Sequence, residues 1–174
     1  MPFTPLHLGP ALALGLPFRR YIHVPTFIVA NVILDIEPLL VLIFGLSYPL
    51  HGYAHTFVFA SIIGLAISYV MFILEKFLKP LYRFLLLTPQ KSFNFKAFAI
   101  AGILGTTIHV LLDSPLYVDI RPFYPLNANP LYNPETSFKM WLTINIICIF
   151  MWIIGLVYYI GLVIYLVMKR RCQK

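Results

Sequence analysis

The stretch PLHGYAHTF, residues 49–57, governs the interpretation of this chain because it places two histidines where a long apolar segment begins. His51 and His55 are four residues apart, and side chains at that spacing lie on one face of an α-helix. Both imidazoles are therefore predicted to reach a common point near the start of a helix.

Two further apolar runs carry polar residues in a similar way. TIHVLLD (residues 107–113) repeats the spacing with His109 and Asp113, and ILDIEP (residues 33–38) sets Asp35 and Glu37 into a third run. The whole chain has only six acidic residues and five histidines, and more than half of them fall in these three places. This concentration indicates a shared site.

The composition is that of a membrane protein. Hydrophobic residues make up 60% of the 174 residues and charged residues only 11%, whereas a soluble domain has roughly 25% charged residues. The mean hydropathy is +0.86, and the length favours a single domain over residues 1–174. The net charge of +7 collects at the ends of apolar runs, as is typical of membrane proteins, which argues against nucleic-acid binding.

The apolar runs predict an all-α fold, an integral membrane helical bundle. About 20 apolar residues are needed to cross a bilayer. Four spans meet this length, at residues 26–46, 53–74, 95–113 and 138–168. A shorter segment at 3–17 carries His7 and is broken by Pro10, so it is predicted to re-enter the membrane or to cross it with a tilt. Residues 114–137 are predicted to form an ordered loop, and part of 75–96 a surface segment.

The basic residues predict the orientation. The segment 76–96 has five and the C-terminal tail four, whereas the 114–137 loop has only Arg121. The positive-inside rule then places the C-terminus in the cytoplasm. At about 1.5 Å per residue, Asp35 and His109 each lie roughly 20 Å from the nearest cytoplasmic basic residue. The polar candidates are thus predicted at similar depths, toward the non-cytoplasmic side.

Imidazole and carboxylate groups within a membrane predict a metal site. An ionised side chain near the bilayer centre costs at least ~2.5 kcal/mol, so such residues usually have a role. The candidate ligands are His7, Asp35, His51, His55, His109 and Asp113. They suit zinc first, with manganese or iron as alternatives. Six ligands exceed the needs of one tetrahedral ion, so two or more ions are predicted, bridged by a carboxylate such as Asp35. Two-metal sites activate a water for ester or phosphoester cleavage.

Several polar residues have more than one interpretation. Glu37 can be a ligand, a general base or a residue at a helix end, and Asp35 or Glu37 is the candidate base. Arg121 suits a substrate anion, or it pairs with Asp119 as an interfacial arginine. His23, beside Pro25 and near Arg20, is more typical of an interfacial histidine than of a ligand.

The motifs PFTPLHLGP, ILDIEP, PLHGYAHTF and HVLLDSPLYVDIRPFYPL together resemble the membrane-bound metal-dependent hydrolase family, particularly its archaeal members. That family is considered distantly similar to zinc-dependent phospholipase C. The resemblance covers residues 2 to about 132, and the final helix adds no motif. It implies a helical membrane hydrolase whose metal ligands are the six residues given above. In two places the chain departs from the family pattern. Glu37 replaces the second acid of a D-x-D element, and HGYAHTF lacks the arginine of the bacterial HRGxTHS.

The sequence therefore predicts a metal-dependent hydrolase embedded in the lipid bilayer, acting on a phosphoester or ester of a lipid or of a small molecule at the membrane interface. One alternative is a non-catalytic metal-binding protein or divalent-cation transporter that uses the same ligands. Another is a structural protein whose polar residues only join helices. The sequence assigns no oligomeric state.

Overall fold

The computed structural model describes residues 5–87 and 94–172, and all regular structure within these ranges is helical. The elements are η1 (Pro5–His7), α1 (Leu8–Gly15), α2 (Val24–Ala30), η2 (Ile33–Asp35), α3 (Ile36–Phe44), η3 (Tyr53–His55), α4 (Phe57–Phe84), α5 (Phe95–Asp113) and α6 (Ser137–Arg171). Here η marks a single turn of 3₁₀-helix. The predicted all-α bundle is confirmed.

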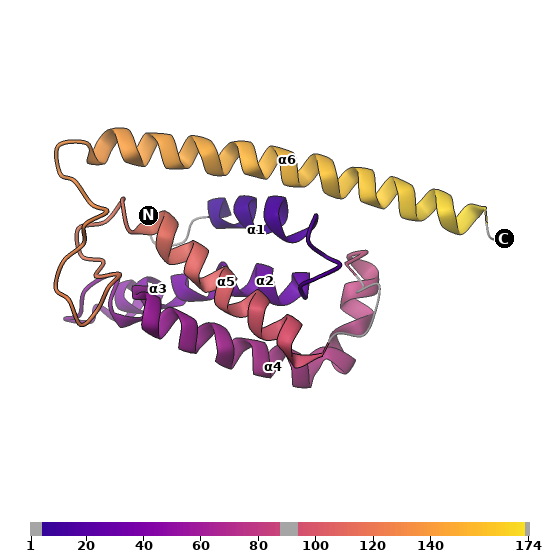
Figure 1. Cartoon of the computed structure of the whole chain (residues 1–174), viewed down its shortest axis with the longest axis horizontal. Helices are drawn as coiled ribbons and strands as arrows, with labels where there is room; N and C mark the ends of the chain where they lie inside the picture. Colours follow the sequence, from indigo (N-terminus) through magenta and orange to yellow (C-terminus); the bar gives the residue numbers. More distant parts are fainter. Residues whose placement is uncertain (1–4, 88–93, 173–174) are drawn as a thin grey trace.

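Four helical stretches are long and apolar enough to cross a membrane. They are Val24–Phe44, which joins α2, η2 and α3, then α4, α5 and Ser137–Lys169 of α6. The eight residues of α1 extend only about 12 Å at 1.5 Å per residue, far less than the ~30 Å hydrocarbon core of a bilayer. The fold is therefore four candidate spans and a short N-terminal helix that cannot cross alone (Figure 1).

The start of α4 differs from the sequence prediction. Thr56 has an extended backbone, and its side chain accepts a hydrogen bond from the Phe59 N–H at 3.2 Å. A threonine in this position caps a helix, which therefore begins at Phe57. His51 and His55 precede the helix, so the prediction that they share a face of an α-helix is wrong.

The far end of α4 also differs. The helix continues through Pro80 to Phe84, so residues 75–84 of the range 75–96 extend α4; that part of this range lies along the membrane surface stays a prediction. Proline lacks the N–H that would bond one turn back, and in Figure 1 the last turns of α4 run in a new direction. The part of that predicted segment at 88–93 lies outside the described residues.

Small residues bring α4 and α5 together. A Cβ atom on Gly64 would lie 2.6 Å from the carbonyl oxygen of Gly102, so the two backbones are in direct contact. The Ser68 hydroxyl donates to the carbonyls of Gly64 at 2.7 Å and Phe98 at 2.8 Å. On the other side of α5, a Cβ on Gly105 would lie 2.7 Å from the Cβ of Ala30 in α2. Gly102 and Gly105 thus let α5 approach α4 and α2 closely.

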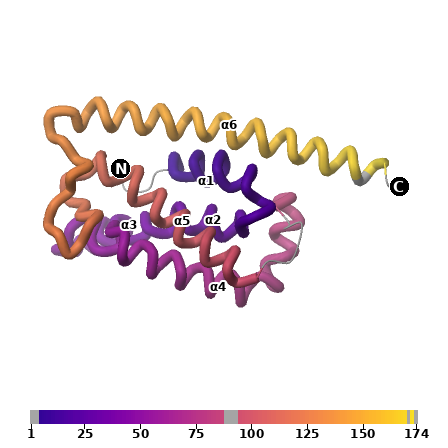
Figure 2. The backbone as a smooth tube through the Cα atoms, viewed as in Figure 1, coloured from indigo at the N-terminus to yellow at the C-terminus, as the bar shows by residue number. Residues whose placement is uncertain are grey.

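The longest helix, α6, lies along the outside and covers α1 (Figures 1 and 2). A Cβ on Gly9 would lie 2.9 Å from the backbone nitrogen of Trp152. The Trp152 indole donates to the Pro5 carbonyl at 2.8 Å. These contacts hold the N-terminal segment between α6 and the rest of the bundle.

The loop between α5 and α6 closes one end of the bundle, where α5 finishes and α4 begins (Figure 2). Its Pro122 carbonyl accepts from the Phe57 N–H at 2.9 Å. The Asn129 carboxamide donates to the Ser114 carbonyl at 2.7 Å. The predicted ordered loop therefore packs against the end of the bundle that holds the polar candidates.

Candidate metal centre

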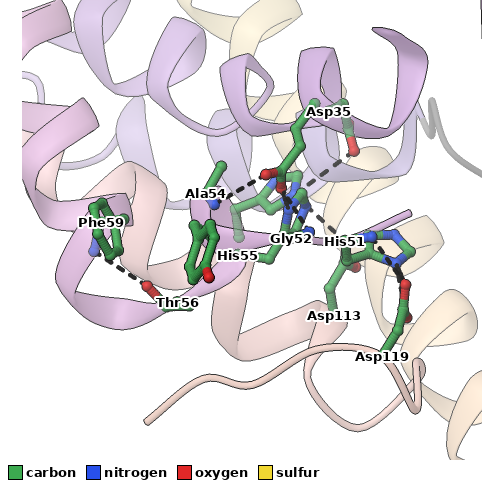
Figure 3. A network of polar contacts seen from close by, with 12 residues as sticks. Asp35, His51, Gly52, Ala54, His55, Thr56, Phe59, Asp113 and Asp119 are labelled. Atoms are coloured by element: carbon green, nitrogen blue, oxygen red, sulfur yellow. Dashed lines mark hydrogen bonds and ion pairs between the residues drawn. The ribbon is translucent and has the colours of Figure 1, made fainter. Parts of the chain in front are cut away.

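The six predicted ligands meet at the loop-covered end of the bundle. Their exposed fractions run from 0% for His55 and His109 to 5% for His7. They form two groups in which potential ligand atoms lie within 4.8 Å of one another. One group is His7, Asp35, His109 and Asp113, and the other is His51, His55 and Asp113. Figure 3 shows Asp35, His51, His55 and Asp113 around a common region.

The first group is built on α5. His109 and Asp113 are one turn apart, with 3.5 Å between Nε2 and Oδ2, as their spacing predicts. Asp35 of η2 brings its Oδ1 to 3.6 Å from the same Nε2. His7 contributes its Nε2 at 3.1 Å from Asp113 Oδ1, and its ring stacks on that of His109 with 4.1 Å between centroids.

The break between α2 and α3 orients His109. In a continuous helix the Asn31 carbonyl would accept from the N–H of residue 35, but the Asp35 N–H bonds instead to the Val32 carbonyl at 3.1 Å. The Asn31 carbonyl accepts from His109 Nδ1 at 2.8 Å. Since a carbonyl can only accept, Nδ1 carries the proton and Nε2 is left with a lone pair facing the carboxylates.

Glu37 orients His55. Its Oε2 accepts from His55 Nδ1 at 2.8 Å and from the Gly52 N–H at 3.0 Å. Its Oε1 accepts from the Ala54 N–H at 3.2 Å and from the Tyr48 hydroxyl at 3.3 Å. Both carboxylate oxygens are occupied, so Glu37 has the contacts of a residue that positions His55 and the turn before α4.

Asp119 orients His51 from the loop. It accepts from His51 Nδ1 at 3.1 Å and from the His51 backbone N–H at 2.9 Å. Burial alone raises the pKa of a carboxyl group, but these hydrogen bonds outweigh it and hold the pKa of Asp119 below its usual value. The ring of Tyr117 lies against His51, with 4.1 Å between centroids.

Three histidines thus share one arrangement: Nδ1 donates to an oxygen, which leaves Nε2 as the nitrogen able to bind a metal. Metal-binding histidines almost always have such a partner. Among the described residues, four buried atoms of the six candidate ligands have no hydrogen-bond partner, namely Nδ1 of His7, Nε2 of His55, Nε2 of His109 and Oδ2 of Asp35. An unsatisfied buried polar group costs ~1–3 kcal/mol, and a bound cation would give the two Nε2 atoms a partner. These residues therefore fit a divalent metal.

Asp113 belongs to both groups, whereas Asp35 belongs only to the first. Asp113 is therefore the carboxylate within reach of both groups, and the bridging by a carboxylate such as Asp35 stays a prediction. The nitrogen and carboxylate donors suit zinc, manganese or iron.

Arg121 and His23 lie outside both groups. Arg121 is exposed, and its guanidinium donates to the Asn127 side-chain oxygen at 2.9 Å. In the described part of the chain Asp119 pairs with His51 rather than with Arg121. His23 is 0% exposed and stacks on Phe98 with 4.0 Å between centroids, so it is a core residue and not an interfacial one.

Sequence reasoning missed the partners of the histidine rings. The sequence does single out Asp119 in one way, because it is one of only six acidic residues and lies within the motif HVLLDSPLYVDIRPFYPL. The Asn31 carbonyl is a backbone group, and no residue type marks it.

Comparisons of the chain with protein-family models, with curated proteins and with solved structures found no match, so the resemblance to the membrane-bound hydrolases stays a prediction.

Proposed function

We propose that this protein is a membrane-embedded, metal-dependent hydrolase that cleaves a phosphoester or ester of a lipid or of a small molecule at the membrane interface. The observation that carries the proposal is the set of three buried histidines whose Nδ1 atoms are each fixed by an acceptor. Their Nε2 atoms are thereby left for a metal beside Asp35 and Asp113. Such preparation of several rings at once is costly without an ion to bind.

His7, Asp35, His109 and Asp113 would hold one ion, and His51, His55 and Asp113 the other, with zinc as the first expectation. When bound, a pair of divalent ions lowers the pKa of a water and stabilises the charge on the leaving oxygen. This proposal places the protein in the same family as the hydrolases it resembles in sequence.

In the reaction, the water oxygen forms a bond to phosphorus while the bond from phosphorus to the ester oxygen breaks. The proton released by the water ends on the leaving alcohol. Asp35 is the candidate base, because its Oδ1 lies 3.6 Å from His109 Nε2 and would hold the ion, which leaves the buried Oδ2 to accept the proton of the water. Glu37 is a weaker candidate, since both its oxygens already accept hydrogen bonds.

We further propose that the centre lies toward the non-cytoplasmic side. The link between α1 and α2 and the C-terminal end of α6 lie at the bundle end away from the α5–α6 loop (Figure 1), and these segments carry the basic residues Arg19, Arg20, Lys169 and Arg171. The positive-inside rule assigns that end, and the C-terminus with it, to the cytoplasm.

A divalent-cation transporter with the same ligands is the main rival. It would need polar side chains leading from the centre to the other side of the membrane. In this chain buried polar residues, among them Asn31, Thr106 and His23, accompany the apolar cluster of Ile22, Phe27 and Ala101. Metal uptake into proteoliposomes therefore separates the transporter from the hydrolase.

The test is metal content, measured by inductively coupled plasma mass spectrometry on the detergent-purified protein. We expect about two equivalents of zinc, manganese or iron in the wild type, and their loss in a His51→Ala/His109→Ala double variant. His23→Ala is the matched control, because His23 is equally buried but belongs to neither group. The metal-loaded protein is then assayed against a panel of phosphoesters and carboxylic esters.

A wild type that neither contains nor takes up metal would overturn the proposal. Metal that copurifies without hydrolysis of any substrate in the panel, together with metal uptake into proteoliposomes, would favour the transporter instead.

A further inference from the structure

Two cavities of about 260 Å³ each reach the candidate metal centre through different ligands. One has His7 and Asp113 in its wall, and the other has His51 and its partner Asp119. Each volume is close to the lower end of the ~300–1,000 Å³ usual for ligand pockets. The two cavities differ in the polarity of their lining residues, and this difference indicates what kind of substrate they would accept.

The first cavity is mainly apolar and lies beneath α6. Leu6 lines it from the N-terminal segment, and Ile144 and Cys148 line it from α6. Two of its wall residues, Trp141 and Ile149, are 46% and 47% exposed on the outer surface. Both belong to a candidate membrane span, so one wall of the cavity is a helix whose outer face would contact acyl chains.

The second cavity has the more polar lining of the two and lies outside the candidate spans. It is lined by loop residues, including Arg121 and the hydroxyl-bearing side chains of Tyr48, Tyr53 and Tyr124. Arg121 uses one nitrogen for Asn127, and a guanidinium has five N–H donors in all. Asp119 also lines the cavity, but both its oxygens bond to His51. This cavity suits an anionic group at the water boundary.

We propose, as an extension of the proposed function, that the substrate is a single-chain amphiphile with an anionic headgroup. Its alkyl chain occupies the cavity beneath α6, its headgroup contacts Arg121, and the scissile ester lies between them at Asp113. Asp113 and His7 both line the apolar cavity, so an alkyl chain that occupies the cavity lies against candidate ligands. Ile144 and Cys148 then limit the length of chain that is accepted.

The experiment measures binding rather than turnover, using ethylphosphonate and decylphosphonate. Their carbon–phosphorus bonds are not hydrolysable esters. Native mass spectrometry of the zinc-treated, detergent-purified protein gives the fraction of protein with ligand bound. Burial of one methylene is worth ≈ 0.8 kcal/mol, or about fourfold in affinity, when the chain comes from water. Decylphosphonate comes from a micelle rather than from water, so its chain gains less affinity per methylene. We expect it to bind at least about tenfold more tightly than ethylphosphonate.

Ile144→Trp, which fills the apolar cavity, should weaken decylphosphonate binding at least about tenfold and leave ethylphosphonate binding unchanged. Ile147→Trp is the matched control, because Ile147 is on the same helix, is 46% exposed and does not line the cavity. Arg121→Gln should weaken both ligands to the same extent.

Equal binding of the two phosphonates by the wild type would overturn this inference, as would equal effects of Ile144→Trp and Ile147→Trp. These outcomes are independent of the proposed function. If decylphosphonate binds as expected but no ester is hydrolysed, the chain site stands and the hydrolase proposal fails. If esters are hydrolysed but neither binding nor hydrolysis depends on chain length, the hydrolase proposal stands and the chain site fails.

Discussion

The Nδ1 atom of His55 lies 2.8 Å from Oε2 of Glu37, and this contact determines which nitrogen of the ring faces the candidate metal centre. The same carboxylate oxygen accepts from the Gly52 N–H at 3.0 Å. Glu37 therefore connects the start of α3 to the turn that precedes α4, and it fixes the ring and the backbone of that turn together.

Glu37→Gln should reduce zinc affinity by about 10–100-fold, which is the usual cost of removing such a partner from a metal-binding histidine. The amide keeps one acceptor oxygen but brings an NH₂ group to the other contacts. A competition titration with a zinc-selective chelator measures the affinity. Glu135→Gln is the control, since Glu135 is exposed in the loop. Equal affinities for the two variants would contradict an orienting role for Glu37.

The two aspartates of the centre should differ in how many ions their loss removes. Asp113→Asn should lower the metal content by about two equivalents, because Asp113 belongs to both groups. Asp35→Asn should lower it by about one. Elemental analysis at matched protein concentration measures both. If the two variants lose the same amount of metal, Asp113 is not the shared ligand.

Removal of metal should lower the thermal stability of the protein. Without an ion the buried Nε2 atoms of His55 and His109 have no hydrogen-bond partner, and a ligand that binds only the folded state stabilises it. A chelator should therefore reduce Tm, and added zinc should restore it. The Tm of the His51→Ala/His109→Ala variant should not change under either treatment. If it changes as much as the wild-type Tm, the stabilising metal binds outside the candidate centre.

Gly102→Ala should destabilise the protein by about 1–3 kcal/mol, the usual range for overpacking. The added methyl group would meet the backbone carbonyl of Gly64 in the neighbouring helix. Gly161→Ala in α6 is the control, because a Cβ there meets nothing within 4 Å and alanine has the higher helix propensity. Denaturation in mixed micelles gives both free energies of unfolding. Equal losses would contradict the close contact of α4 and α5.

His23 should make the fold sensitive to acid. Burial lowers its pKa from 6.5 to about 4, and it shares a hydrogen bond with the Thr26 hydroxyl at 2.8 Å. The neutral ring is therefore favoured in the folded state, and the stability it allows above pH 6.5 is lost as the pH falls toward 4. At about 1.4 kcal/mol per pKa unit, the loss is on the order of 3 kcal/mol.

A His23→Phe variant isolates this contribution, since it can still stack on Phe98 but cannot titrate. The free energy of unfolding should fall less between pH 7 and pH 4 in the variant than in the wild type. Parallel curves for the two proteins would assign the acid sensitivity to other groups.

Much of the fold follows from local chemistry. The span predicted at residues 95–113 has the bounds of α5, and the structure adds that Asn94 caps this helix. The start of α4 was placed too early, because an apolar run does not show that Thr56, directly after His55, caps the helix.

The candidate site was predictable as a set of residues but not as an arrangement. Scarce histidines and acids in apolar runs mark the six ligands, since burial without a partner is costly for them. Their depth along the helices gives no information on which carboxylate lies between the two groups, and so Asp35 was preferred to Asp113. The burial of His23 likewise depends on Phe98, which is distant in sequence.

The position of α1 under α6 has a consequence for biosynthesis. His7 is the first of the six residues to leave the ribosome, and α6 is synthesised after all of them. Because α1 is too short to anchor itself across a bilayer and the preceding Pro5 carbonyl accepts from Trp152 of α6, the N-terminal segment is held in place only when α6 has been inserted. The polar cluster is thus completed after its other five residues have been made, and an intermediate that lacks α6 holds them without a fixed His7.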